Sequence, residues 1–203
     1  MTERDALRSV LEDAQRLGFL GRDPVERHIE HAILWAGSLD PAAFLDLGSG
    51  GGIPGLVFAL QWPTVPGTLL DGQLRRTAWL RTATSRLELS GRVTVLEGRA
   101  EDLAHTPDLR ERFPLVVARS FGPPSSTAEC ASGFLTVGGV LTVSEPPGGT
   151  PERWPTEVLA TLGLDSARRV VHEGASFVIL PKSSELPDEF PRRRNLLVRS
   201  PLW

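Results

Sequence analysis

The sequence has 203 residues, of which 40% are hydrophobic and 23% are charged, and its formal net charge is −3. This composition is typical of one soluble globular domain and lacks the strong positive charge of a protein coated with nucleic acid. The sequence has no apolar run near the roughly 20 residues that cross a bilayer, no signal-peptide core and only one cysteine, which excludes an internal disulfide. We therefore expect one cytoplasmic domain without a membrane partner.

The first forty residues predict two helices. Apolar residues recur at helical spacing from Ala6 to Leu17 and glycines follow, while Pro24 opens a second helix that ends at Gly37. At the other end, residues 183–203 are basic and rich in proline, which predicts an extended tail. We expect N-terminal helices over residues 1–40, a core over 41–182 and this tail, all within a single domain spanning 1–203.

Strand-like and helical segments alternate through the core. Strands are predicted at 44–47, 67–71, 93–96, 115–118 and 139–143, and helices at 54–61, 76–90, 126–135 and 152–162. Two closing strands, 168–172 and 176–180, are separated by Glu173 and Gly174, which suit a hairpin turn. The alternation predicts an α/β, Rossmann-like fold with a mostly parallel seven-stranded sheet and helices on both faces.

A glycine-rich loop follows the first strand of the core. Gly48, Gly50 and Gly52 allow the backbone to turn sharply and to approach a ligand closely. Asp71 ends the next strand, where a carboxylate can accept hydrogen bonds from ribose hydroxyls. The two features together indicate a cofactor that contains a nucleoside.

Two residues distinguish between the cofactors that use such loops. Asp46 precedes the first glycine, where dehydrogenase loops usually carry an apolar residue, and Ile53 occupies the position of the third glycine of the dinucleotide fingerprint. Both favour S-adenosylmethionine. A nicotinamide dinucleotide, or a loop that binds no ligand, remains an alternative.

From Asp46 to Gly55 the sequence resembles the GidB/RsmG family, whose loop reads Asp-x-Gly-x-Gly-x-Gly-Leu/Ile/Phe-Pro-Gly. The resemblance continues in order over nearly the whole chain, at residues 28–32, 69–72, 75–80, 98–102, 117–121 and in the tail at 190–193 and 199–202. It implies a class I methyltransferase that uses S-adenosylmethionine to methylate nitrogen 7 of a guanine in 16S ribosomal RNA.

The resemblance carries the family's donor site to Gly48, Ile53, Ala100, Glu101 and Arg119. To these we add Asp46, Gly50, Gly52 and Asp71 from the loop and the ribose argument. The expected partner is 16S ribosomal RNA or the small ribosomal subunit; DNA is not expected, and the protein is expected to be a monomer. Arginines that could contact RNA phosphates are Arg75, Arg76, Arg192, Arg193, Arg194 and Arg199.

The chain departs from the family where RNA contacts are expected. The segment 144–148 replaces a lysine-glycine pair, 195–197 replaces Gly-Thr-Pro, and Ala78 stands in place of an arginine. A divergent paralogue that methylates another RNA or a small molecule, and an inactive scaffold, therefore remain alternatives.

Nitrogen 7 of guanine carries a lone pair and no proton, so its methylation requires no general base and we predict no catalytic residue of that kind. Cys130 lies among small residues of a predicted helix and is expected to be a packed core thiol. His28 and His31 could share a helix face, but no third ligand is evident, so no metal site is predicted.

Overall fold

The structure, a computed structural model, describes residues 2–146 and 148–203. Met1 and Pro147 lie outside the described residues, and Pro147 belongs to the segment 144–148 that departs from the family. The chain divides after Gly98 into two compact units, which are described in turn.

The first unit begins with the two expected helices, α1 (Glu3–Arg16) and α2 (Val25–Ala36). Thr2 starts α1 with a capping box, because its hydroxyl accepts from the Asp5 amide while the Asp5 carboxylate accepts from the Thr2 amide. The buried face of α1 consists of Leu7, Val10, Leu11 and Ala14, at helical spacing. The N-terminal helical extension is confirmed.

Three parallel strands follow in the first unit: β1 (Phe44–Leu47), β2 (Gly67–Asp71) and β3 (Val93–Glu97), with β2 paired to both others. Helix α3 (Gly55–Gln61) connects β1 to β2, and α4 (Leu74–Arg86) connects β2 to β3. All four residues of β1 are buried, as expected of a strand covered on both faces. Helix α4 ends earlier than predicted, before Glu88, whose φ is +58°.

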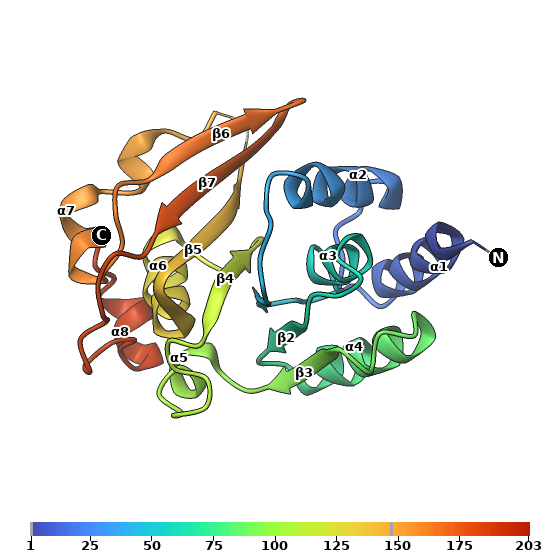
Figure 1. Ribbon diagram of the computed structural model, residues 1–203, viewed down its shortest axis with the longest axis horizontal. Coiled ribbons are helices and arrows are strands. Elements are labelled where there is room, and N and C mark those ends of the chain that lie inside the picture. The colour runs from blue at the N-terminus through green and yellow to red at the C-terminus, as the bar shows by residue number, and fades with distance from the viewer. Residues whose placement is uncertain (1, 147) are drawn as a thin grey trace. The chain divides into compact units, whose positions relative to one another are not determined.

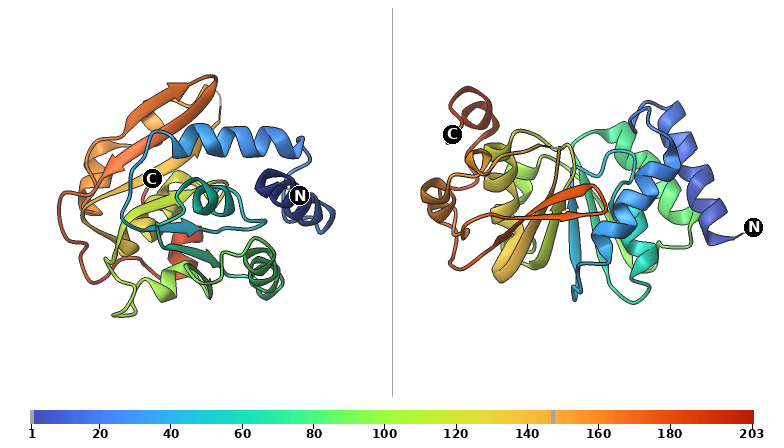
Figure 2. Two further views of the ribbon diagram at one scale, coloured as in Figure 1. Left: turned by 45° about the vertical axis from the view of Figure 1, so that its right-hand side comes forward. Right: turned by 90° about the horizontal axis from the view of Figure 1, so that it is seen from above.

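The second unit contains the parallel pair β4 (Phe113–Ala118) and β5 (Leu135–Glu145), connected by α6 (Pro124–Phe134). An antiparallel hairpin, β6 (Arg168–His172) and β7 (Ala175–Pro181), pairs with β5 through β7. Figures 1 and 2 show this hairpin in orange. Glu173 and Gly174 turn it with positive φ, as a type I′ turn requires. The predicted hairpin is confirmed.

Two sequence-based expectations for the second unit need correction, and one helix was missed. The helix predicted at 152–162 is a 3-10 turn η1 (Pro151–Arg153) followed by α7 (Thr156–Thr161), because Pro155 interrupts the helical hydrogen bonds. Helix α5 (Ala100–Leu103) was not predicted. The tail is not extended throughout, since it forms α8 (Arg194–Arg199), which packs on α6 (Figure 1).

Lys182, just after β7, is fully buried within the second unit. Its ammonium donates to the carbonyls of Ser132 and Leu135, each at 2.8 Å, and forms an ion pair with Glu111. The lysine therefore provides hydrogen-bond donors for backbone carbonyls at the point where α6 ends and β5 begins.

The strands and helices of the two units confirm the predicted α/β class with mostly parallel pairing, while the single domain over 1–203 stays a prediction. None of the helices in the described ranges is both long and apolar enough to cross a bilayer.

Candidate functional site

The glycine loop, residues 48–52, reverses direction directly after β1. Gly48, Gly50 and Gly52 have φ of +76°, +54° and +101°, a region that other residues enter only with strain. The amides of Gly48 and Ser49 both donate to the carbonyl of Leu70, at 2.8 and 2.9 Å. The loop is thus held against the end of β2.

Asp71 at the end of β2 is hydrogen-bonded to this loop. Its Oδ2 accepts from the Gly50 amide and its Oδ1 accepts from the Gln73 amide, each at 2.9 Å, while Arg76 lies 3.6 Å from Oδ2. A carboxylate oxygen has two lone pairs, so each keeps capacity for a further donor. Two predicted donor-site residues are therefore brought into contact, in an arrangement compatible with the two hydroxyls of a ribose.

Asp46 holds the start of α3. Its Oδ2 accepts from the Gly55 amide at 2.9 Å, which places a negative charge at the helix N-terminus. A Cβ at Gly55 would lie 2.5 Å from the same oxygen, so only glycine allows this contact. Ile53, which lies between these two residues in the sequence, is buried. The structure thus gives Asp46 a role in the loop itself, and its role at a cofactor stays a prediction.

The arginines of α4 are mostly paired with acids of the first unit. Arg76 lies beside Asp71, Arg81 beside Glu97 and Arg86 beside Asp13. Arg75 is exposed and its guanidinium lies over the Phe19 ring, 5.8 Å from the ring centre. Of the predicted RNA contacts in this unit, Arg75 is thus the more available for a phosphate.

In the second unit, Ala100 and Glu101 are buried in the first turn of α5, and Arg119 directly follows β4. The next residue, Ser120, has a φ of +56°, which strains a residue other than glycine. Strained backbone of this kind is concentrated at ligand sites and switch regions. The strained turn after β4 is therefore compatible with a ligand site.

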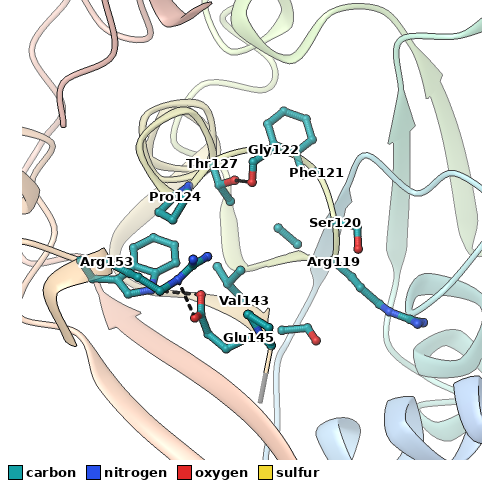
Figure 3. A pocket seen from close by; sticks show the side chains of 13 residues that line it. Arg119, Ser120, Phe121, Gly122, Pro124, Thr127, Val143, Glu145 and Arg153 are labelled. Carbon is teal, nitrogen blue, oxygen red and sulfur yellow. Dashed lines mark hydrogen bonds and ion pairs between the residues drawn. The ribbon is translucent and has the colours of Figure 1, made fainter. Parts of the chain in front are cut away.

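A cavity of about 280 Å³ lies at the carboxyl ends of β4 and β5, beside the start of α6 (Figure 3). We call it the β4–β5 cavity. Its apolar wall is formed by Ala118, Phe121, Pro124, Val143 and Trp154. Its polar side chains are those of Arg119, Ser120, Thr127, Ser144, Glu145 and Arg153. Ligands of open α/β sheets bind outside the carboxyl ends of the strands, so its position is that of a binding site.

Glu145 is the carboxylate of this cavity and is almost fully buried. Its Oε1 accepts from Trp154 Nε1 at 3.1 Å, and its Oε2 lies 2.9 Å from Arg153 Nε, as drawn in Figure 3. A Cβ at Gly149 would lie 2.5 Å from Oε2, so glycine there leaves room for the carboxylate. Sequence reasoning noted this segment only as a departure from the family. Its position at the carboxyl end of a parallel strand was the available signal.

The tail arginines have different environments. Arg192 forms an ion pair with the fully buried Glu129 of α6, whereas Arg193, Arg194 and Arg199 are exposed. The structure therefore gives Arg192 a packing role within the unit. RNA contact by the exposed three stays a prediction.

Cys130 is buried in α6, and burial together with the charges of Glu101 and Glu129 raises the pKa of its thiol. The expected core thiol is confirmed. His28 is buried in α2, with its Nε2 3.3 Å from the Gly21 carbonyl oxygen. Among the residues that the structure describes, no three histidine, cysteine or acidic side chains could hold a metal ion.

Comparison with known proteins connects these features to a family. A family model described as rRNA small subunit methyltransferase G matches residues 22–144. The ribosomal RNA small subunit methyltransferase G of Moorella thermoacetica is 31% identical over 188 residues, covering 87% of this chain and 77% of the relative. The protein of the same name from Chloroflexus aggregans is 33% identical over 168 residues, covering 80% and 70%.

A solved structure agrees in fold. The O-methyltransferase from Bacillus cereus, in complex with SAH, aligns with a TM-score of 0.63 at 16% identity, over 87% of this chain and 90% of that one. At this identity the likeness concerns the fold alone. It confirms the Rossmann-like arrangement of class I methyltransferases.

Proposed function

Because this chain belongs to the family of ribosomal RNA small subunit methyltransferase G, we propose that it methylates nitrogen 7 of a guanine in 16S ribosomal RNA, with S-adenosylmethionine as cofactor. The observation that best supports a nucleoside cofactor here is the pair of hydrogen bonds that orients Asp71 at the glycine loop. A nicotinamide dinucleotide is disfavoured as the cofactor, because Ile53 occupies the position of the third glycine in the dinucleotide-binding fingerprint.

When bound, S-adenosylmethionine supplies a methyl group on a sulfonium, which a ring nitrogen can attack. In the first unit, Asp71 would accept from the ribose hydroxyls and the glycine loop would allow the backbone close to the ligand. In the second unit, we assign Glu101 and Arg119 to the same ligand from the family pattern.

The guanine nitrogen needs no base, so the residues of the chain have to orient the reactants and exclude water. The buried Cys130, whose pKa is raised, is unsuited to the nucleophilic step that methylation of cytosine carbon 5 requires. The β4–β5 cavity offers an apolar wall and a few polar groups, as sites for one aromatic ring do. These features disfavour cytosine carbon 5 and are compatible with guanine as the acceptor.

We further propose that the protein acts as a monomer, in the cytoplasm, on the small ribosomal subunit or its RNA. The exposed arginines of the tail and Arg75 would contact RNA phosphates. Methylation would then decline steeply with increasing salt. The molecular mass in solution, measured by light scattering, tests the monomer.

A deletion strain tests the acceptor. Its 16S RNA is mapped for the missing methyl group, and the strain is complemented with this chain or with its Gly50→Val variant. Valine is β-branched and the loop has positive φ there, so the variant should not restore the methyl group. Full methylation of the RNA in the deletion strain would refute the ribosomal assignment.

Calorimetry distinguishes an active methyltransferase from an inactive scaffold. Binding of S-adenosylmethionine or its demethylated product is expected for any methyltransferase, including one with another RNA or a small molecule as acceptor. Absence of heat and of a thermal shift with both ligands would favour an inactive scaffold.

A further inference from the structure

The β4–β5 cavity is of a size and character suited to a single nucleobase. Its volume of about 280 Å³ is at the lower limit of ligand pockets, which hold roughly 300–1,000 Å³. Phe121 and Trp154 contribute aromatic surface, on which unstacked bases commonly pack. Enzymes that modify a base commonly take it out of its stack into such a pocket.

A guanine that is to be methylated at nitrogen 7 must direct the edge that carries this atom to the methyl donor, which leaves another edge for recognition by the protein. Nitrogen 7 and oxygen 6 lie on the first edge, and both are acceptors. The adjacent Watson–Crick edge carries the N1–H and N2 amino donors. These donors require acceptors in the pocket, because burying them without a partner costs free energy.

Glu145 is the carboxylate among the described residues that line this cavity. The Trp154 indole donates to one lone pair of Oε1 and so orients the carboxylate before any ligand arrives, while the part-exposed Arg153 approaches Oε2. Each oxygen retains a second lone pair. Two adjacent acceptors in one plane match the two adjacent donors of guanine, whereas adenine presents an acceptor at its N1 position.

We propose that Glu145 determines specificity for guanine, by accepting hydrogen bonds from N1–H and the N2 amino group of the base in the β4–β5 cavity. This inference rests on the proposed function. Glu145 stands within the segment 144–148, which replaces the family's lysine-glycine pair.

The test compares two bases in two proteins. Small subunits are reconstituted with guanosine or inosine at the position mapped in the deletion strain, and kcat/KM is measured for the wild type and for Glu145→Gln. Inosine lacks the N2 amino group. We expect the kcat/KM of the wild type to be about 10-fold or more higher on guanosine than on inosine. For Glu145→Gln we expect kcat/KM on guanosine to fall about 10- to 100-fold, and the ratio of its kcat/KM values on guanosine and inosine to fall toward one.

Arg153→Met is the matched control, because it breaks the same ion pair and leaves the carboxylate as an acceptor that the Trp154 indole still orients. It should retain the wild-type preference for guanosine over inosine. Unfolding midpoints and S-adenosylmethionine affinity are measured for all three proteins, and both should be preserved in Glu145→Gln. An equal loss of preference in both variants, or an unchanged preference in Glu145→Gln, would overturn the inference. A wild type that methylates neither RNA would refute the proposed function itself.

Discussion

Arg192 and the fully buried Glu129 form a bidentate ion pair: Nε and Nη2 of the arginine lie 2.8 and 2.7 Å from the two carboxylate oxygens. The backbone amide of Arg192 adds a third hydrogen bond at 2.7 Å. The carboxylate in turn raises the pKa of Arg192. The pair fastens the start of the basic tail to α6, so this arginine serves the fold.

Replacing Arg192 by alanine should therefore destabilise the protein. The Glu129 carboxylate would remain buried without its cation, which costs about 3–5 kcal/mol in the free energy of unfolding. Urea unfolding at neutral pH measures this change. A variant as stable as the wild type would show that water or another group replaces the guanidinium.

Replacing Arg193 and Arg194 together by alanine should leave the stability of the protein almost unchanged and weaken RNA methylation. Both side chains are exposed, so the free energy of unfolding should change by no more than about 0.5 kcal/mol per site. RNA methylation should fall and its salt dependence should become shallower, since two phosphate contacts are lost. S-adenosylmethionine affinity should not change. Normal methylation at all salt concentrations would exclude these arginines from the RNA interface.

Asp71→Ala should weaken S-adenosylmethionine binding by about 1–3 kcal/mol, measured by calorimetry. The substitution removes the ribose acceptor and leaves the Gly50 and Gln73 amides without their partner. Asp40→Ala, at an exposed position before β1, is the control and should bind normally. Equal affinities of the two variants would exclude Asp71 from the donor site.

Arg119→Ala should lower donor affinity or turnover by about tenfold or more without unfolding the protein, because the proposed charge-assisted hydrogen bond from its guanidinium to the donor would be lost. Arg168→Ala, on the exposed surface of β6, removes the same charge elsewhere and should leave both quantities unaltered. If the two variants behave alike, the family pattern does not transfer at residue 119.

Glu111 should make folding sensitive to acid. Burial acts to raise its pKa, but the hydrogen bond from Lys182, the Leu186 amide and nearby positive charge outweigh it, so its pKa lies below the ordinary 4.5. The stabilisation is therefore complete above pH 4.5 and disappears as pH falls through the lowered pKa. Glu111→Gln should cost about 1–3 kcal/mol at pH 7 and less at pH 3. A difference that is constant with pH would contradict this assignment.

Much of the fold follows from local sequence pattern. The buried strand Phe44–Leu47, the glycines with positive φ after it, and the Glu173-Gly174 turn were all predicted, because each depends on residues close in sequence. Errors arose where a single residue overrides a helical pattern, as Pro155 does. The short helix Arg194–Arg199 was missed because tertiary contacts with α6, rather than propensity, stabilise it.

The candidate site was predictable only in part, for a similar reason. Asp71 follows the pattern of a strand end and was identified from it. The role of Glu129 in holding Arg192, 63 residues away, and the enclosure of Glu145 by Trp154 and Arg153 depend on tertiary packing. Charge in the sequence therefore suggested six RNA-binding arginines, of which the structure pairs two, Arg192 and Arg76, with the buried carboxylates of Glu129 and Asp71.

Lys182 is the only lysine in the sequence, and its ammonium is completely enclosed in the folded protein. Reagents that acylate side-chain amines can therefore reach residue 182 only while the carbonyls of Ser132 and Leu135 have released it. The rate of labelling at this one position, followed by mass spectrometry, would measure how often this part of the second unit opens. Because the sequence has a single lysine, amine labelling of the side chains reports the local unfolding of this one region.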